Sequence, residues 1–231
     1  SIYLNSIYFI NSNTGFVVGG NKCFRTINAG LNWDSIPVGF EPSFAKIIFV
    51  NSTVGFILIN SGKILKTTNT GVNWSVSGEI VSPTDLFFTN QNIGYCCRYN
   101  QLWKTTNQGS DWYALPNSST LFDRLFFLNE TTGFSASHYT PGPPPLLAPA
   151  VLVYSTIDSG RNWTNISPPL NTVLGSVPRS IHFLTETIGY IGNARGLMTD
   201  VFFKTINGGV TWFNQLPSNV SVINSIYFIN S

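Results

Sequence analysis

The chain has 231 residues, which is enough for one sizeable core or for a single ring of repeats. Charged residues make up 10% of it, against roughly 25% in an ordinary globular chain, and the net charge of +2 is not gathered in any basic run. Nucleic acid is therefore excluded as an expected partner, because phosphate binding needs clustered lysine and arginine.

No stretch approaches the roughly 20 apolar residues that cross a bilayer, so the sequence predicts no membrane span. The chain begins at Ser1 without an initiator methionine, a charged leader or an apolar leader. We therefore expect it to be a segment of a longer protein.

A glycine followed by an aromatic residue recurs along the chain, with a Phe six residues before each glycine. The intervals between successive glycines are nearly equal, apart from a longer one before Gly189. A period of about 40 residues with regular glycine and aromatic signals is typical of the blades of a β-propeller. The copies are Phe9 with Gly15-Phe16, Phe49 with Gly55-Phe56, Phe88 with Gly94-Tyr95, Phe127 with Gly133-Phe134, and Phe183 with Gly189-Tyr190.

A second pattern follows each of these, and we call it the Thr-Asx-Gly-Trp motif. Its Asn or Asp side chain can accept hydrogen bonds from nearby backbone N–H groups, its Gly supplies positive φ, and its Trp anchors the hairpin. Four of the five copies have Asn rather than Asp, which keeps the turn and makes carboxylate chemistry there implausible. The copies are Thr26, Asn28, Gly30, Trp33; Thr67, Asn69, Gly71, Trp74; Thr105, Asn107, Gly109, Trp112; Thr156, Asp158, Gly160, Trp163; and Thr205, Asn207, Gly209, Trp212.

The motif resembles the Asp-box of sialidase-like propellers, and most closely the variant in the photosystem II stability/assembly-factor-like repeat family. The two patterns together predict an all-β propeller of four-stranded antiparallel blades, with the motif turn between strands three and four of each blade. Family members similar to this chain often have seven blades, whereas five are expected within this sequence. The expected blades are about 3–38, 44–80, 84–116, 121–168 and 180–217, with 220–231 starting a further blade or the next repeated domain.

Three segments are longer than the repeat requires: 138–150 between strands two and three of blade four, 194–199 in the same place of blade five, and the link 167–179. Turns alternate between the two faces of an up-and-down blade, so these segments should converge on the face opposite the motif turns. We expect a partner surface there, and the alternative that the proline-rich insertion only covers blades four and five stays open. The candidate residues are His138, Tyr139, Pro143, Pro144, Pro145, Leu146, Leu147, Arg195 and Met198.

The sequence NSIYFINS occurs at Asn5–Ser12 and again at Asn224–Ser231. Blades share only a consensus at this strand, so the identity suggests that the five-blade set is itself a repeated unit. Three alternatives stay open: a sixth blade that happens to match, a larger ring cut short, and a deliberately repeated closing strand.

Catalytic patterns are hard to find. A glycosidase needs facing carboxylates, and none of the ten acidic residues recurs in a suggestive place. Asp85 and Arg124 occupy neighbouring positions on the first strands of two blades, which an ion pair or a solvated channel lining explains. His182 stands where other blades have an aromatic or apolar residue and should pack as one, and His138 is expected in a loop.

The remaining polar and sulfur side chains have similarly plain interpretations. The three cysteines replace apolar residues of other repeats and should be buried small hydrophobes rather than a disulfide or metal site; they are Cys23, Cys96 and Cys97. Four blades have a basic residue immediately before the motif threonine: Arg25, Lys66, Lys104 and Lys204. These residues form either a ring of solvated side chains or a contact stripe for an acidic partner. No cofactor, metal site or catalytic residue is predicted.

The sequence favours a non-enzymatic structural or adhesive module of a large secreted bacterial surface protein, such as a filament of repeated domains. The resemblance implies this context, because such repeats are common in long extracellular proteins of surface-attached bacteria. Expected partners are proteins or cell-surface groups, above all neighbouring domains or subunits of the same protein, with a glycan as a further candidate. An assembly chaperone for a membrane-protein complex is the alternative, and a fragment of a sialidase-like carbohydrate-active enzyme is a third.

Overall fold

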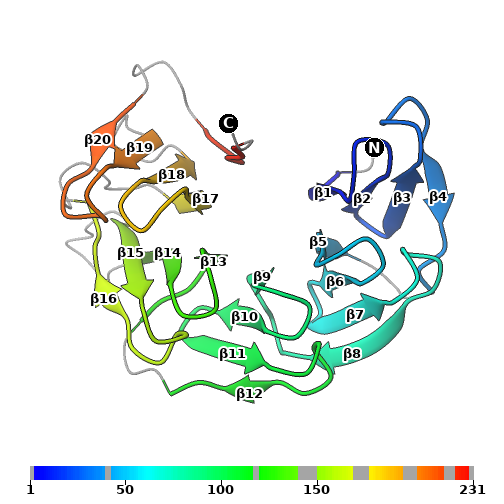
Figure 1. Cartoon of the computed structure of the whole chain (residues 1–231), viewed down its shortest axis with the longest axis horizontal. Coiled ribbons are helices and arrows are strands. Elements are labelled where there is room, and N and C mark those ends of the chain that lie inside the picture. Colours follow the sequence, from blue (N-terminus) through cyan, green and yellow to red (C-terminus); the bar gives the residue numbers. More distant parts are fainter. Residues whose placement is uncertain are drawn as a thin grey trace, which may run out of the picture. The chain divides into compact units, whose positions relative to one another are not determined.

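Five four-stranded antiparallel sheets make up the computed structural model, which describes residues 3–39, 43–116, 120–139, 150–168, 177–194, 202–215 and 222–228. Each sheet is a meander in which strands adjacent in sequence are hydrogen-bonded, and we call the sheets blades one to five (Figure 1). No helix lies among these residues. Blade one is β1 (Ser6–Phe9), β2 (Gly15–Gly19), β3 (Lys22–Thr26) and β4 (Asp34–Ile36); blade two is β5 (Phe44–Phe49), β6 (Gly55–Ile59), β7 (Lys63–Thr67) and β8 (Ser75–Glu79); blade three is β9 (Asp85–Phe88), β10 (Gly94–Arg98), β11 (Gln101–Thr105) and β12 (Tyr113–Ala114); blade four is β13 (Arg124–Phe127), β14 (Gly133–Tyr139), β15 (Ala150–Thr156) and β16 (Thr164–Asn165); blade five is β17 (Val177–Phe183), β18 (Gly189–Ala194), β19 (Phe202–Thr205) and β20 (Phe213–Asn214).

The chain divides into two compact units. Unit 1 comprises Ser1–Cys96 and Trp103–Tyr113, and unit 2 comprises Cys97–Leu102 and Ala114–Ser231. Blades one and two belong to unit 1, blades four and five belong to unit 2, and the division runs through blade three. Every contact described below lies within one of these units.

Burial changes from strand to strand within a blade. The second strands β2 and β6 are buried at all five positions, so both of their faces are covered. The fourth strands β4, β12, β16 and β20 are mostly exposed and form the open edge of their sheets. A four-stranded sheet with a fully buried central strand needs a neighbour on each face, which is how stacked blades are stabilised.

The recurring glycine accommodates the Phe of its own blade. A Cβ atom built on Gly15 would lie 2.7 Å from the Phe9 ring, and one on Gly189 would lie 2.3 Å from the Phe183 ring. The glycines of blades two, three and four are equally close to their own Phe rings. No side chain fits at that distance, so the glycine is required by close approach rather than by an unusual backbone angle.

In blades one, two and four, the aromatic residue after the glycine contacts the next blade. Its ring stacks on the recurring Phe of the following blade, which joins the two blades into one hydrophobic cluster. The stacked pairs are Phe16–Phe49 at 4.6 Å, Phe56–Phe88 at 4.0 Å and Phe134–Phe183 at 3.4 Å between ring centroids. The recurring Phe thus contacts the glycine of its own blade and the aromatic residue of the preceding blade.

The motif threonine organises its turn. In blade two, the Thr67 hydroxyl donates to Asn69 Oδ1 (3.0 Å) and accepts from the backbone N–H of Gly71 (3.0 Å). Asn69 Oδ1 also accepts from the N–H of Asn73, four residues ahead (2.9 Å). The same bonds recur in the other four blades, so each turn is closed by two side chains rather than one.

Two consecutive residues of each turn have positive φ. The motif glycine does so in every blade, with Gly71 at +75°. The residue before it does so as well, although it is glycine only in blade five; Thr70, for example, has φ of 58°. The motif Trp ends the turn immediately before the fourth strand and packs edge-on against the recurring Phe of its blade, as Trp74 does on Phe49 at 6.2 Å.

All three cysteines are buried and none forms a disulfide, as expected for small core residues. Burial raises the pKa of the Cys23 thiol to about 12. The part of the chain that the structure describes holds no helix with the length and hydropathy of a membrane span.

Candidate functional site

The predicted partner surface is only partly within the described residues. His138 lies in β14, paired with Val151 of β15, and not in a loop as expected. β14 continues through Tyr139 because these residues keep the hairpin ladder with β15. The other candidates lie outside the described residues: Pro143, Pro144, Pro145, Leu146, Leu147, Arg195 and Met198.

Asp123, which no sequence pattern singled out, forms the centre of a polar cluster with His138. One oxygen of its carboxylate, Oδ2, lies 2.7 Å from His138 Nδ1 and accepts from the Ser137 hydroxyl (3.0 Å) and from the His138 N–H (3.2 Å). The Asp123 side chain is 12% exposed and the His138 side chain 30% exposed. We call these three residues the Asp123 cluster.

The Asp123 cluster orients an imidazole. If Nδ1 carries the proton, it donates to Asp123, and the lone pair of Nε2 is then available as an acceptor. None of the described residues hydrogen-bonds Nε2. Ser137 donates to the carboxylate and not to the imidazole, so the three residues do not form a Ser-His-Asp catalytic triad. With Nδ1 protonated, the cluster can hold one polar acceptor in place near the end of β14.

Polar contacts also join the first strands of neighbouring blades. In unit 1, the ammonium of Lys46 in blade two forms an ion pair with the buried carboxylate of Asp85 in blade three (2.5 Å). In unit 2, Arg124 of blade four donates from Nε to the carbonyl of Arg179 in β17 of blade five (2.9 Å). Asp85 and Arg124 thus each have a partner of their own on an adjacent blade.

His182 packs as an aromatic residue, as the sequence predicted. Its ring lies 4.6 Å from that of Phe126 and 5.3 Å from that of Phe228. Burial lowers the pKa of the imidazole, because desolvation disfavours the charged form. His182 therefore contributes to packing between blades in its neutral form.

The basic residues before the motif threonine lie over the aromatic ring paired with them on the second strand. Each cation is 5.2 to 5.9 Å from the ring centroid, within the range of a cation–π interaction. Burial lowers the pKa of Lys66. The pairs are Arg25–Phe16, Lys66–Phe56, Lys104–Tyr95 and Lys204–Tyr190.

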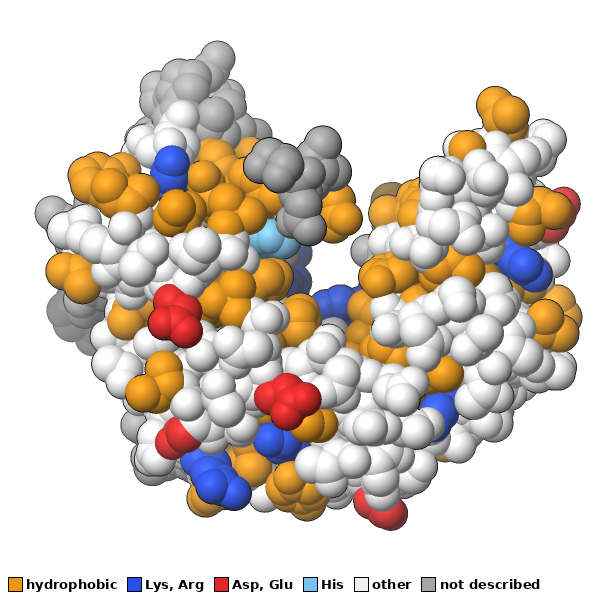
Figure 2. Space-filling view, in the orientation of Figure 1, with side chains coloured by type: hydrophobic (Ala, Val, Ile, Leu, Met, Phe, Trp, Pro, Cys, Tyr) orange, Lys and Arg blue, Asp and Glu red, His pale blue; other side chains and the backbone are white. Residues whose placement is uncertain are grey.

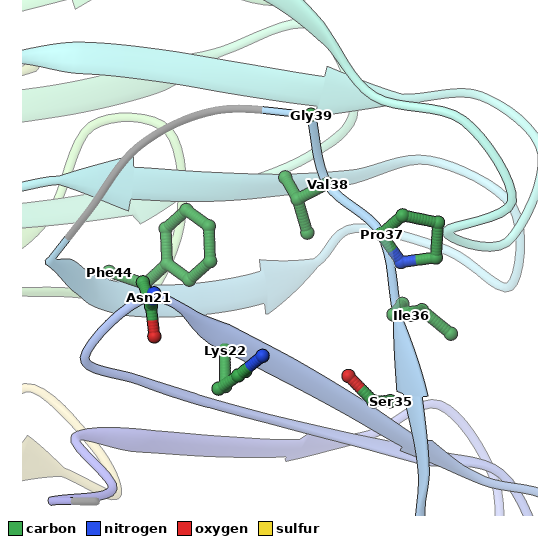
Figure 3. Close-up of a pocket in the computed structure, with 8 residues that line it drawn as sticks. All are labelled: Asn21, Lys22, Ser35, Ile36, Pro37, Val38, Gly39 and Phe44. Atoms are coloured by element: carbon green, nitrogen blue, oxygen red, sulfur yellow. The ribbon is translucent and has the colours of Figure 1, made fainter.

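A hollow of about 480 Å³ lies at the end of blade one (Figure 3). Val38 and Phe44 give it an apolar side, and Lys22 is its one charged residue among the described lining residues. This composition indicates no particular chemistry. The lining residues are Asn21, Lys22, Ser35, Ile36, Pro37, Val38, Gly39 and Phe44.

Charged side chains are scattered on the face shown in Figure 2, where isolated acidic and basic groups lie among polar and hydrophobic ones. Exposed hydrophobic side chains recur at the motif turns, as Ile27, Leu31, Val72, Ile157 and Val210 show. Such a surface favours short-range contacts over long-range electrostatic attraction.

Solved structures similar to this chain are of two kinds. Glycoside hydrolases are one: the GH74 enzyme of Niastella koreensis matches with a TM-score of 0.69 and 18% identity, and the GH74 xyloglucanase of Xanthomonas campestris matches with a TM-score of 0.71 and 11% identity. These matches cover 93% and 92% of this chain and 38% of each enzyme, so the chain spans little more than a third of their length.

The other kind is YCF48. A structure described as YCF48 bound to D1 peptide matches with a TM-score of 0.53 and 16% identity, over 95% of this chain and 84% of that one. No family model matches the chain, and no curated protein matches it in sequence. These neighbours are β-propellers, and with five four-stranded antiparallel sheets this chain has the same fold: the predicted all-β propeller is confirmed.

The expectation that the chain is not an enzyme is contradicted by the comparisons. Three of the structures that it matches are GH74 enzymes, including an ancestral GH74 enzyme at a TM-score of 0.71. That expectation relied on the absence of a paired-carboxylate pattern from the sequence, whereas the matched GH74 enzymes have a similar propeller fold.

Proposed function

We propose that this chain is a binding propeller module that recognises a protein or peptide partner, and that it is part of a larger extracellular surface protein. The contact surface centres on the end of blade four, at the Asp123 cluster. The observation that carries the proposal is the Asp123 cluster, which holds the partly exposed imidazole of His138 in one orientation.

The position of His138 suits recognition of a polypeptide. A neutral imidazole that donates from Nδ1 to Asp123 accepts a hydrogen bond at Nε2, and backbone N–H groups of an extended peptide are donors of that kind. Because the chain has few charged residues, its affinity for a peptide depends mainly on directional hydrogen bonds and on the burial of apolar surface. The match to YCF48 bound to D1 peptide, over nearly the whole of this chain, supports a peptide as the class of partner.

The test uses the full chain as bait against a displayed library of random peptides. Peptides selected by the wild-type chain should lose about tenfold or more in affinity on His138→Ala, the loss expected from one directional hydrogen bond to an oriented group. His182→Phe is the matched control, because it removes the other histidine from a packed position. Selected peptides that bind both variants equally would place the contact surface elsewhere.

A polysaccharide is the second candidate partner, favoured by the similarity to GH74 enzymes and by the presence of a carboxylate in the cluster. Glycoside hydrolysis uses two carboxyl groups on opposite sides of the bond. Among the described residues of unit 2, Asp123 lies in the cluster, whereas Glu130, Asp158 and Glu186 lie at turns between strands. The second carboxylate would have to come from beyond the described residues.

Incubation of the full chain with xyloglucan, followed by an assay for reducing ends, tests this second candidate. Hydrolysis that Asp123→Asn abolishes would establish it. Binding of xyloglucan without hydrolysis would indicate a recognition module for polysaccharide. If the chain neither hydrolyses nor binds xyloglucan, a peptide remains the favoured partner.

An extracellular location and an adhesive role belong to the same proposal. Their support is the low charge of the chain and the second occurrence of NSIYFINS at Asn224–Ser231. Protease treatment of intact cells that express the parent protein checks the location, since a surface-exposed propeller is cleaved or released while internal proteins stay intact.

A further inference from the structure

Residues 222–228 lie against blade five in the way that blade two lies against blade one. The backbone N–H of Ile226 donates to Ser180 Oγ of β17 (3.0 Å), and the N–H of Ile47 donates to Ser6 Oγ of β1 (3.2 Å). Ser180 and Ser6 are equivalent positions, each three residues before the recurring Phe. The backbone alignment of the two pairs is therefore the same.

Ring contacts repeat this correspondence. Phe228 contacts Tyr190 in a tilted arrangement with ring centroids 4.6 Å apart, and Phe49 stacks on Phe16 at the same centroid distance of 4.6 Å. Phe228 also lies 5.3 Å from His182. Its counterpart in unit 1 is the contact of Phe49 with Tyr8 at 6.0 Å. Residues 222–228 thus occupy the position of the first strand of a blade that follows blade five.

Among the described residues, the blade-five residues that contact this strand include no Lys, Arg, Asp or Glu. We define the blade-five face as Ser180, His182, Tyr190 and Gly192. Ile223 packs on Gly192 so closely that a Cβ there would lie 2.5 Å from Ile223 Cγ2, and the N–H of Ile223 donates to the carbonyl of Asn193 (3.0 Å). The fit is therefore specific in shape as well as in hydrogen bonding.

Blade one carries the complementary surface, which is exposed among the described residues. Ile7 is 58% exposed and Phe9 is 41% exposed, although the equivalent residues of blades two, four and five are only 1% to 6% exposed. Those equivalents are Ile47, Phe49, Leu125, Phe127, Ile181 and Phe183. In blade one, Ser6 and Tyr8 contact blade two, so Ile7 and Phe9 point to the opposite side, where a preceding blade would lie.

We propose that the blade-five face is a docking surface for blade one of a second copy of this chain. Residues Asn5–Phe9 and Asn224–Phe228 have the same sequence, so β1 of the second copy makes the contacts that residues 224–228 make here. The incoming strand replaces residues 224–228 and brings β2 and β3 of its own sheet with it. Because the two surfaces differ, the copies join head to tail.

Sedimentation velocity of the full chain at increasing concentration tests the proposal. We expect dimers and larger head-to-tail species, and we expect Ile7→Glu to weaken the association about tenfold or more, because it places a charge in the buried interface. Val72→Glu is the matched control, since Val72 is 60% exposed at a motif turn of another blade and should associate as the wild type does.

A second variant removes the competing strand. Ile226→Pro lacks the N–H that donates to Ser180 Oγ, so residues 222–228 should leave the blade-five face and association should become stronger. Ile7→Glu in the same chain should reverse that gain. Monomers of the Ile226→Pro chain at all concentrations, or equal effects of Ile7→Glu and Val72→Glu, would overturn the proposal. A monomer that Ile7→Glu destabilises would also overturn it, since blade one would then close on the blade-five face of its own chain.

Discussion

Replacing Gly71 by alanine should destabilise the protein through two separable effects. Gly71 has φ of +75°, where an L-residue with a Cβ costs about 1–2 kcal/mol. Its Cβ would also lie 2.7 Å from Cε1 of Phe16, a fully buried ring stacked on Phe49, and overpacking of this kind costs about 1–3 kcal/mol. The free energy of unfolding should therefore fall by about 2–5 kcal/mol.

Gly30→Ala is the control, because it isolates the backbone effect. Gly30 has φ of +86°, but the nearest atom to its Cβ is 3.7 Å away, in Trp33. Its substitution should cost only the backbone share, about 1–2 kcal/mol. The effect on the unfolded chain is the same in both variants and cancels in the comparison.

Urea unfolding followed by tryptophan fluorescence measures both variants. The midpoint should fall further for Gly71→Ala than for Gly30→Ala while the slope stays unchanged. Equal losses would refute the inference that the motif turn of blade two contacts blade one. Earlier unfolding of one blade pair, seen as a second transition, would show that the two units unfold independently.

Three further predictions concern single residues. Thr105→Val should cost about 2–3 kcal/mol, since it removes the acceptor of the buried Gly109 N–H and of the partly buried Asn107 N–H. Thr106→Val, on the exposed side of the same turn, should be close to neutral in chemical denaturation. Burial lowers the pKa of His182 in the folded protein, so the unfolded chain binds more protons and stability should fall as the pH drops below 6.5, the ordinary pKa of histidine. His182→Phe should reduce the change in melting temperature between pH 7 and pH 5. The raised pKa of Cys23 should keep this thiol unreactive towards a thiol reagent in native protein and reactive in denaturant, as counted by mass spectrometry.

The motif turns could be predicted because their chemistry is local. Thr67, Asn69 and Gly71 lie within five residues, so their spacing alone brings the hydroxyl, the carboxamide and the backbone N–H within bonding distance. The role of the threonine was missed, although its recurrence in all five copies was the signal. The second position with positive φ was missed too, because the residue there differs from blade to blade. Only in blade five is it a glycine, Gly208.

The candidate site shows the limit of reasoning from spacing. His138 was singled out for its place before the proline-rich insertion, but its partner Asp123 is 15 residues earlier, immediately before β13. Only the register of β13 and β14 brings the two together, and that register depends on the Phe127–Gly133 contact. A sequence search that had aligned the blades on this contact would have placed Asp123 opposite Ser137.

Sequence by itself determined the strands, the turns and the repeat, because each depends on residues that are neighbours along the chain. Tertiary structure alone decided which aromatic ring meets which: Phe49 carries the same pattern as Phe9, yet Phe49 is buried against Phe16 and Phe9 is exposed. The difference has a physical cause, since a ring on a first strand is buried where a ring of a neighbouring blade packs on it, as Phe16 does on Phe49. Identical sequences, such as Asn5–Phe9 and Asn224–Phe228, therefore have different environments in one molecule.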